Sequence, residues 1–84
     1  METNEHDDSP AGRMLALNEV LLHQYLKGLA DANPRIRRKA AHRLAGLGKA
    51  AERALPQLEV LLLDPDRHVR DAAALTVKRI TVGE

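Results

Sequence analysis

The chain has 84 residues and a formal net charge of +1, which allows one small domain and gives no strong bias toward an acidic or basic partner. The absence of cysteine excludes disulfides, thiolate metal sites and a cysteine nucleophile. Leu and Ala supply most of the hydrophobic residues, and Phe and Trp are absent. Because Leu and Ala favour helices, this composition predicts an all-α fold.

Residues 1–13 are predicted to form a disordered acidic tail, and residues 14–84 the folded domain. The tail holds four carboxylates and almost no apolar side chains, too few to offset the entropy cost of ordering it. It lacks the basic-then-apolar order of a secretory signal, and no apolar run approaches the roughly 18 residues of a membrane span. We therefore expect a cytoplasmic protein with no membrane partner.

The first predicted helix covers residues 14–30, and the second covers residues 34–46. Asn33 is a good N-cap for the second helix, and Pro34 occupies its first position, where a missing N–H costs nothing. Apolar residues recur at helical spacing along both segments. The expected core positions are Met14, Leu15, Leu17, Leu21, Leu22, Tyr25, Leu26, Leu29, Ile36, Ala40, Leu44 and Leu47.

The third predicted helix covers residues 50–63, and the fourth covers residues 67–81. Pro56 lies inside the third helix, so we expect a kink or an irregular first turn there. Asp66 precedes the fourth helix and is its expected N-cap. The expected core positions are Ala51, Leu55, Leu58, Leu62, Val69, Ala73, Val77 and Ile80.

The chain contains an internal repeat with a period of 33 residues. At this shift, residues 31–48 align with residues 64–81, and Asp31 and Arg37 fall on Asp64 and Arg70. Each unit is a long apolar helix, a turn that contains Asp, and a shorter helix. A repeat of this length is typical of proteins built from stacked helix pairs.

The second unit carries a recognisable series of residues. In order it contains Leu55-Pro56, Leu58, Leu62, Asp64-Pro65-Asp66, Val69-Arg70 and Ala72-Ala73-Ala74. This series resembles the HEAT repeat, and the bacterial phycobilisome-lyase-type HEAT-like repeats are the nearest in style. The resemblance implies a right-handed α-solenoid fragment of two helix pairs, four helices in all, that binds other macromolecules.

The recurring Asp and Arg residues are predicted to be structural. On a helical wheel, Arg37 lies near Leu44 and opposite Arg35, away from the polar side of its helix. We expect Arg37 and Arg70 to bond the carboxylates of Asp31 and Asp64, within and between repeats. This predicted ladder consists of Asp31, Arg37, Asp64 and Arg70.

Basic residues concentrate between positions 34 and 53, a segment that contains seven Lys or Arg and only one Glu. Several of them share one side of the second helix, and the matching side of the fourth helix carries further polar residues. The family resemblance places these helices on the concave side of the solenoid, its usual docking surface. The candidate partner-binding residues are Arg35, Arg38, Lys39, His42, Arg43, His68, Leu75 and Arg79.

Two functions fit this surface. The favoured one is a scaffold or protein-binding module that takes an acidic segment of a protein partner. The alternative is binding to a nucleic-acid backbone, which the low net charge and the lack of aromatic stacking residues support less well. A third interpretation is that these basic residues only keep the surface soluble and bind no partner.

No catalytic, metal or cofactor-binding residues are predicted. The four histidines do not lie at the three-, four- or five-residue spacing of a helical metal pair, and the chain has one Ser and no Gly-rich phosphate loop. We therefore expect no enzyme activity, no metal and no cofactor.

The C-terminal repeat has an apolar margin formed by Val60, Leu61, Leu63 and Leu75. Such margins mark interaction sites, so a homodimer or a partner's helix capping this repeat is one interpretation. Packing of the same residues within the small domain is the other.

Overall fold

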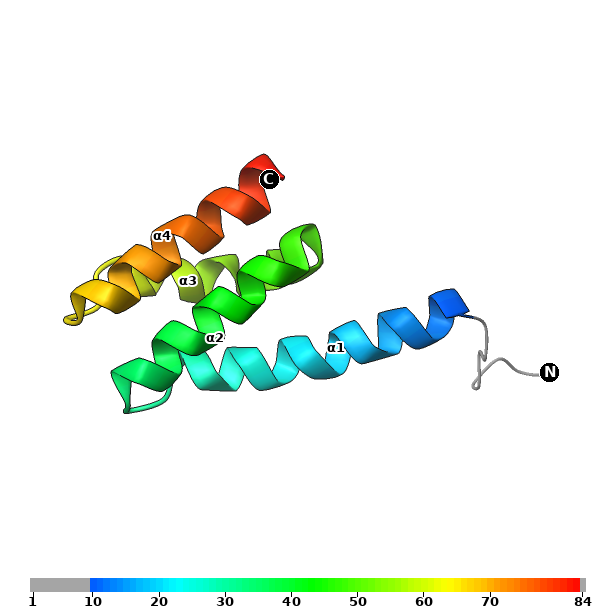
Figure 1. Ribbon diagram of the computed structural model, residues 1–84, viewed down its shortest axis with the longest axis horizontal. Helices are drawn as coiled ribbons and strands as arrows, with labels where there is room; N and C mark the ends of the chain where they lie inside the picture. Colours follow the sequence, from blue (N-terminus) through cyan, green and yellow to red (C-terminus); the bar gives the residue numbers. More distant parts are fainter. Residues whose placement is uncertain (1–9, 84) are drawn as a thin grey trace.

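The computed structural model describes residues 10–83, which form an all-helical fold without a strand. Their α-helices are α1 (Pro10–Leu29), α2 (Pro34–Leu47), α3 (Leu55–Leu61) and α4 (Arg67–Val82). A 3-10 helix, η1 (Gly48–Ala54), joins α2 to α3. Helices α2 and α4 lie side by side, α3 lies behind them, and the N-terminal half of α1 extends beyond the other helices (Figure 1).

Helix α1 begins at Pro10 rather than near Met14. Residues 10–13, which we expected in the disordered tail, are therefore helical. The rest of the predicted tail, residues 1–9, lies outside the described residues. Pro at the first position explains the early start, because its fixed φ suits a helix and its missing N–H has no partner there in any case.

Both predicted N-caps are present. The Asn33 side chain accepts a hydrogen bond from Arg35 N at 2.9 Å, and the Asp66 carboxylate accepts from His68 N at 2.8 Å and Val69 N at 3.1 Å. These bonds satisfy backbone donors that the first turn of a helix leaves free. They fix where α2 and α4 begin, and hence which side chains follow at each start.

The predicted third helix divides into η1 and α3. Ala51 and Ala54 of η1 are both fully buried, and the backbone of η1 is non-helical at Ala51, with φ −96° and ψ 16°. Helix α3 continues this buried line with Leu58 and Leu61, which is 6% exposed. The prediction of Leu62 as a core residue was wrong: Leu62 lies just beyond the end of α3 and is 37% exposed.

The core lies between the two helix pairs. Of the residues expected along α1, Leu22 and Leu29 are buried and Leu17 is 52% exposed, whereas Met14 and Leu15 are outside the described side chains. The other buried apolar residues are Ala40, Ala41, Leu44, Ala51, Ala54, Leu58, Leu61, Val69, Ala72, Ala73 and Ile80, with Tyr25, Leu26, Leu47, Leu55 and Val77 packed against them.

Ile36, like Leu17 and Leu62, was wrongly predicted to be a core residue. It is 43% exposed, whereas Val69, at the matching position of the second repeat, is fully buried. Helix α2 packs against α4 on the side of α4 that carries Val69. No described residue covers the matching side of α2, which carries Ile36. Equivalent positions of a repeat therefore differ in burial according to whether a neighbouring repeat covers them.

Candidate partner-binding surface

An ion pair joins the two repeats. The Arg37 guanidinium donates from Nε to Asp64 Oδ2 at 2.8 Å and from Nη2 to Asp64 Oδ1 at 3.0 Å. The two side chains are 15% and 5% exposed. A bidentate, largely desolvated pair of this kind constrains geometry closely, so it sets how α2 sits against the turn before α4.

Within each repeat, the arginine bonds backbone carbonyls instead of the predicted carboxylate. Arg37 Nη1 donates to Asp31 O at 2.8 Å, and Arg70 Nη1 donates to Asp64 O at 2.7 Å. Asp31 Oδ1 instead accepts from Asn33 N at 2.8 Å. Aspartate in a turn commonly bonds the N–H two residues later, which turns the carboxylate away from its own arginine and leaves the carbonyl free to accept.

The surroundings of the Asp64 carboxylate lower its pKa. The hydrogen bonds from Arg37 lower its pKa, and the backbone N–H of Asp66 and the charges of Arg37 and Arg70 act in the same direction. Burial opposes them by raising this pKa. The same pairing raises the pKa of Arg37. Both groups are therefore held in their charged forms, as a structural ion pair requires.

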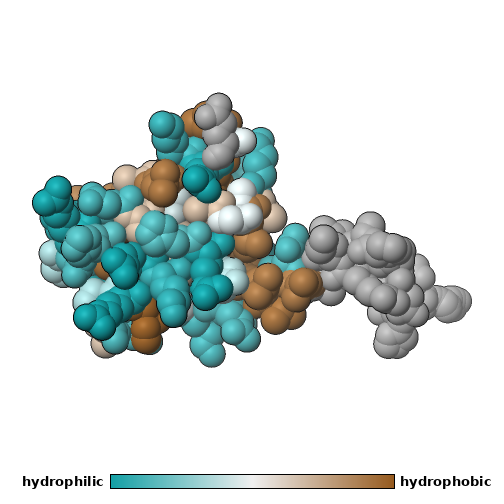
Figure 2. Space-filling model, viewed as in Figure 1, coloured by the Kyte–Doolittle hydropathy of each residue, from teal (hydrophilic) through white to brown (hydrophobic). Residues whose placement is uncertain are grey.

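Five of the candidate residues line one shallow groove of about 590 Å³ along α2. All five are exposed, and no acidic residue lines this groove. Polar residues cover most of the side of the molecule where α2 and α4 lie, as Figure 2 shows. We name this surface the basic face; it consists of Arg35, Arg38, Lys39, His42 and Arg43.

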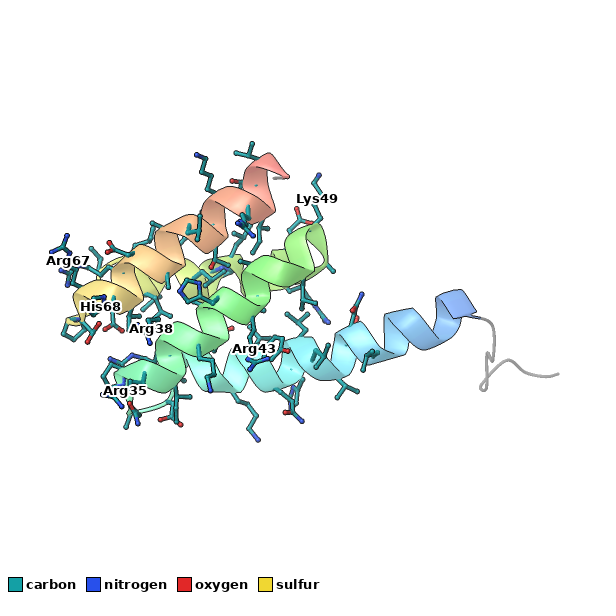
Figure 3. The ribbon with its side chains drawn as sticks, viewed as in Figure 1. Arg35, Arg38, Arg43, Lys49, Arg67 and His68 are labelled. Atoms are coloured by element: carbon teal, nitrogen blue, oxygen red, sulfur yellow. The ribbon has the colours of Figure 1, made fainter. Side chains whose placement is uncertain are left out.

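A second shallow groove, of about 430 Å³, lies between the N-termini of α2 and α4. Arg35 and Arg38 line it from α2, and His68 and Asp66 line it from α4. Figure 3 shows Arg38 extending from α2 toward α4, with His68 at the facing end of α4. The structure thus brings His68 next to the basic face, as the sequence suggested.

Two candidate residues lie elsewhere. Arg79 lines a separate depression at the opposite ends of α2 and α4, together with Lys49 and Gly83. Leu75 is 42% exposed on α4 and lines none of the grooves described above. The predicted set of eight residues therefore does not form one continuous site, because α4 carries Asp71 and Leu75 where α2 carries Arg38 and His42.

Thr76 is a buried polar residue that the sequence did not single out. Its Oγ1 lies 2.7 Å from the carbonyl oxygens of both Ala41 and Ala72, so it can donate across to α2 or back along α4. At the 33-residue shift it aligns with the exposed Arg43, so the repeat itself gives no indication that position 76 is buried and polar. Thr76 is therefore a fully buried polar contact between α4 and α2.

Metal and membrane sites receive no support from the described residues. Residues 10–83 contain no group of three His, Asp or Glu side chains placed to hold a metal ion. Among the described helices, none combines the length and apolarity needed to cross a membrane.

Comparison with known proteins places the chain in a family of helical repeats. The family described as HEAT repeats matches residues 18–84, which include nearly all of the described helices. Neither a curated protein nor a solved structure gave a match. The match covers most of the chain, and both the paired helices and the 33-residue period are typical of stacked helical repeats. The chain therefore belongs to the HEAT repeat family.

Proposed function

We propose that this protein is a non-enzymatic interaction module whose basic face binds an acidic segment of a protein partner. HEAT repeats commonly mediate protein–protein interaction. The observation that carries the proposal is the groove along α2, in which five exposed basic or imidazole side chains converge without a carboxylate. The absence of Cys and the single Ser support a role without covalent catalysis.

Several of these cations must act together. An exposed ion pair contributes only about 0–1 kcal/mol, because water and salt screen it and long side chains lose freedom when they pair. A segment with carboxylates at successive helical or extended positions can contact Arg35, Arg38 and Lys39 at once. Binding of this kind is expected to weaken steeply as salt rises, since the Debye length falls from about 10 Å at 0.1 M to about 3 Å at 1 M.

Binding of the same face to a nucleic-acid backbone is the alternative. The phosphate backbone would use the same cations, and it would likewise give a strong salt dependence. Sequence-tolerant binders of single strands add aromatic side chains on which bases stack. Tyr25 is the only aromatic residue, and it is packed against the core, so this part of the chemistry is missing.

We further propose that the helix pairs form a right-handed solenoid fragment with α2 and α4 on its concave side, supported by the side-by-side packing of these two helices (Figure 1). We also propose membership of the bacterial phycobilisome-lyase-type subgroup, on the resemblance that residues 55–74 show to it. A cytoplasmic scaffold role fits a chain without cysteine.

Self-association, or capping of the C-terminal repeat by a partner, is a second candidate. It is supported by large apolar side chains on α3, the turn that follows it, and α4: Val60 is 68% exposed, Leu63 86% and Leu75 42%. Exposed apolar residues that gather at one end of a repeat protein mark a place where another element can pack.

The basic face is tested by reversing its charge. The variant Arg35→Glu, Arg38→Glu, Lys39→Glu, Arg43→Glu should retain the helical circular dichroism spectrum, because all four side chains are exposed. Its affinity for a fluorescein-labelled oligo-glutamate peptide should fall at least about tenfold, which corresponds to about 1.4 kcal/mol. Fluorescence anisotropy at low and high salt, with a labelled DNA duplex as the second probe, measures both candidate ligands.

A variant with four reversals elsewhere controls for net charge. It carries Lys27→Glu, Lys49→Glu, Arg53→Glu and Lys78→Glu, which lie outside the basic face and are also exposed. If this control loses as much affinity as the first variant, binding follows net charge and the basic face has no special role. Tight binding of the duplex but not of the peptide would favour the nucleic-acid alternative.

A further inference from the structure

The two repeats hold their arginines in the same way but leave them with different partners. Arg37 Nη1 lies 2.8 Å from Asp31 O and 3.0 Å from Ala32 O. Arg70 Nη1 lies 2.7 Å from Asp64 O and 3.1 Å from Pro65 O. These paired bonds fix the plane of each guanidinium, so Arg70 is oriented like Arg37 before any partner arrives.

The remaining donors of Arg70 have no acceptor within the described residues. Arg37 directs Nε and Nη2 at the Asp64 carboxylate, whereas the described hydrogen bonds of Arg70 all come from Nη1. Asp31 presents the complementary case at the other end of the molecule. Like Asp64, it accepts a backbone N–H two residues later, but no guanidinium among the described residues reaches it.

The surroundings of both groups show the same incompleteness. Ala41 on α2 is fully buried, whereas Ala74, at the matching position on α4, is exposed. Leu29 is 3% exposed and the matching Leu62 is 37% exposed. One end of the molecule therefore repeats the surface that the first repeat buries against the second. At the other end, near Asp31, Ile36 is 43% exposed where the matching Val69 is fully buried, so part of the surface that the second repeat offers in return is repeated there.

We propose that a second copy of this chain docks head to tail, with Arg70 of one copy bound to the Asp31 carboxylate of the next. The contact repeats the internal interface: α4 of one copy packs on α2 of the next, and Arg70 Nε and Nη2 take the two carboxylate oxygens. This inference refines the proposed self-association. It places Lys39 and Arg43 of the basic face at the contact between copies, and its test does not use the acidic probe.

The contact is heterologous, because the two copies use different surfaces, so it propagates instead of closing at a dimer. Lys39 and Arg43 stand where Ala72 and Thr76 stand in the internal interface, which makes the contact between copies looser than the internal one. Association is therefore expected to be weak and to depend on concentration.

Sedimentation equilibrium of the full chain tests the proposal. From about 10 μM to about 1 mM protein, the weight-average mass should rise above 9.3 kDa without a plateau at twice that value, as expected for an open chain of copies. Asp31→Asn, which keeps the acceptor for Asn33 N, and Arg70→Gln should each abolish the rise. Glu52→Gln and Arg79→Gln, both at exposed sites, should leave it unchanged.

Growth of the wild-type chain beyond a dimer separates this geometry from a symmetric dimer, and mixing the two variants tests whether Arg70 and Asp31 pair between copies. Asp31→Asn retains Arg70, and Arg70→Gln retains Asp31, so an equimolar mixture should form a dimer that grows no further. Thermal melts followed by circular dichroism verify that both variants are folded, and Arg70→Lys replaces Arg70→Gln if that variant is not.

Three results would overturn the proposal. A wild-type chain that stays monomeric at 1 mM overturns both this contact and self-association in general. A dimer that neither variant disturbs retains self-association but rejects the Arg70–Asp31 contact. A mixture of the two variants that stays monomeric while the wild-type chain associates rejects the head-to-tail geometry. Each is independent of whether the basic face binds the oligo-glutamate probe.

Discussion

Replacing Asp64 with Asn is expected to lower the free energy of unfolding by about 1–3 kcal/mol, the cost of leaving buried hydrogen-bonding groups without a proper partner. The amide has nearly the same shape as the carboxylate. It can still accept from Asp66 N, which bonds Asp64 Oδ1 at 2.9 Å. Its NH2 group, however, points donors at a guanidinium that itself offers only donors. The bidentate pair with Arg37 is thereby lost.

Urea denaturation followed by circular dichroism measures the change, and a double-mutant cycle with Arg37→Gln isolates the pair. The double variant should be less destabilised than the two single variants summed. Asp71→Asn is the matched control, because its carboxylate is 70% exposed and lies 3.8 Å from Arg67. That variant should change stability by less than about 0.5 kcal/mol. Equal effects of Asp64→Asn and Asp71→Asn would contradict the structural role of Asp64.

The same pair gives a pH dependence. The pKa of Asp64 is lower in the folded protein than its ordinary value of about 3.9, chiefly because Arg37 donates to the carboxylate. Its contribution to stability is therefore fully present above the ordinary pKa and is lost as the pH falls through the folded value. Between pH 6 and pH 2, Asp64→Asn should lose less stability than the wild-type chain. Parallel curves for the two proteins would show that Asp64 is not the group responsible.

Replacing Gly28 with Ala is the second change expected to have a large effect. A Cβ atom at this position would lie 2.8 Å from Ala40 Cβ, across the contact between α1 and α2. Neither atom can rotate away, because both are fixed by the helix backbones, so the helices must separate. Overpacking of this kind costs about 1–3 kcal/mol. The gain of about 0.5–1 kcal/mol from removing a helical glycine only partly offsets it.

A swap of the two residues tests the steric cause. In the double variant Gly28→Ala, Ala40→Gly, the new methyl group takes the space of the one removed, so stability should partly return. Gly46→Ala is the control, since a Cβ there meets nothing within 4 Å. It should raise the free energy of unfolding by about 0.5–1 kcal/mol, the usual gain for Gly to Ala in a helix. Destabilisation by both substitutions to the same degree would reject close helix contact as the cause.

Local sequence determined much of the fold. The excess of Leu and Ala predicted a helical protein, and Asn33 and Asp66 marked the starts of α2 and α4. The 33-residue period indicated stacked helix pairs. Pro56 signalled an irregular start to the third helix, which the structure shows as η1 followed by α3. All of these signals act within one helix or one turn, so they can be read without knowing what packs nearby.

Which residues are buried depended on the neighbours. Val69 and Ile36 occupy the same place in the repeat, yet only Val69 is covered. Leu61 is 6% exposed and lies in the core, whereas Leu62, just beyond the end of α3, is 37% exposed. A helical wheel drawn for one regular helix contains neither the break between η1 and α3 nor the adjacent repeat, so it could not predict these positions.

The partners of the polar side chains were also decided by the tertiary structure. The sequence indicated that Asp and Arg recur together, but it did not show that Arg37 takes the carboxylate of the next repeat and only the carbonyls of its own. It gave no sign that Thr76 bridges toward α2. The sequence by itself determined the helices, their caps and their period, because those follow from interactions between residues close along the chain. The acceptor chosen by each donor was settled only by packing, because hydrogen bonds form with whichever oxygen the assembled helices bring within about 3 Å.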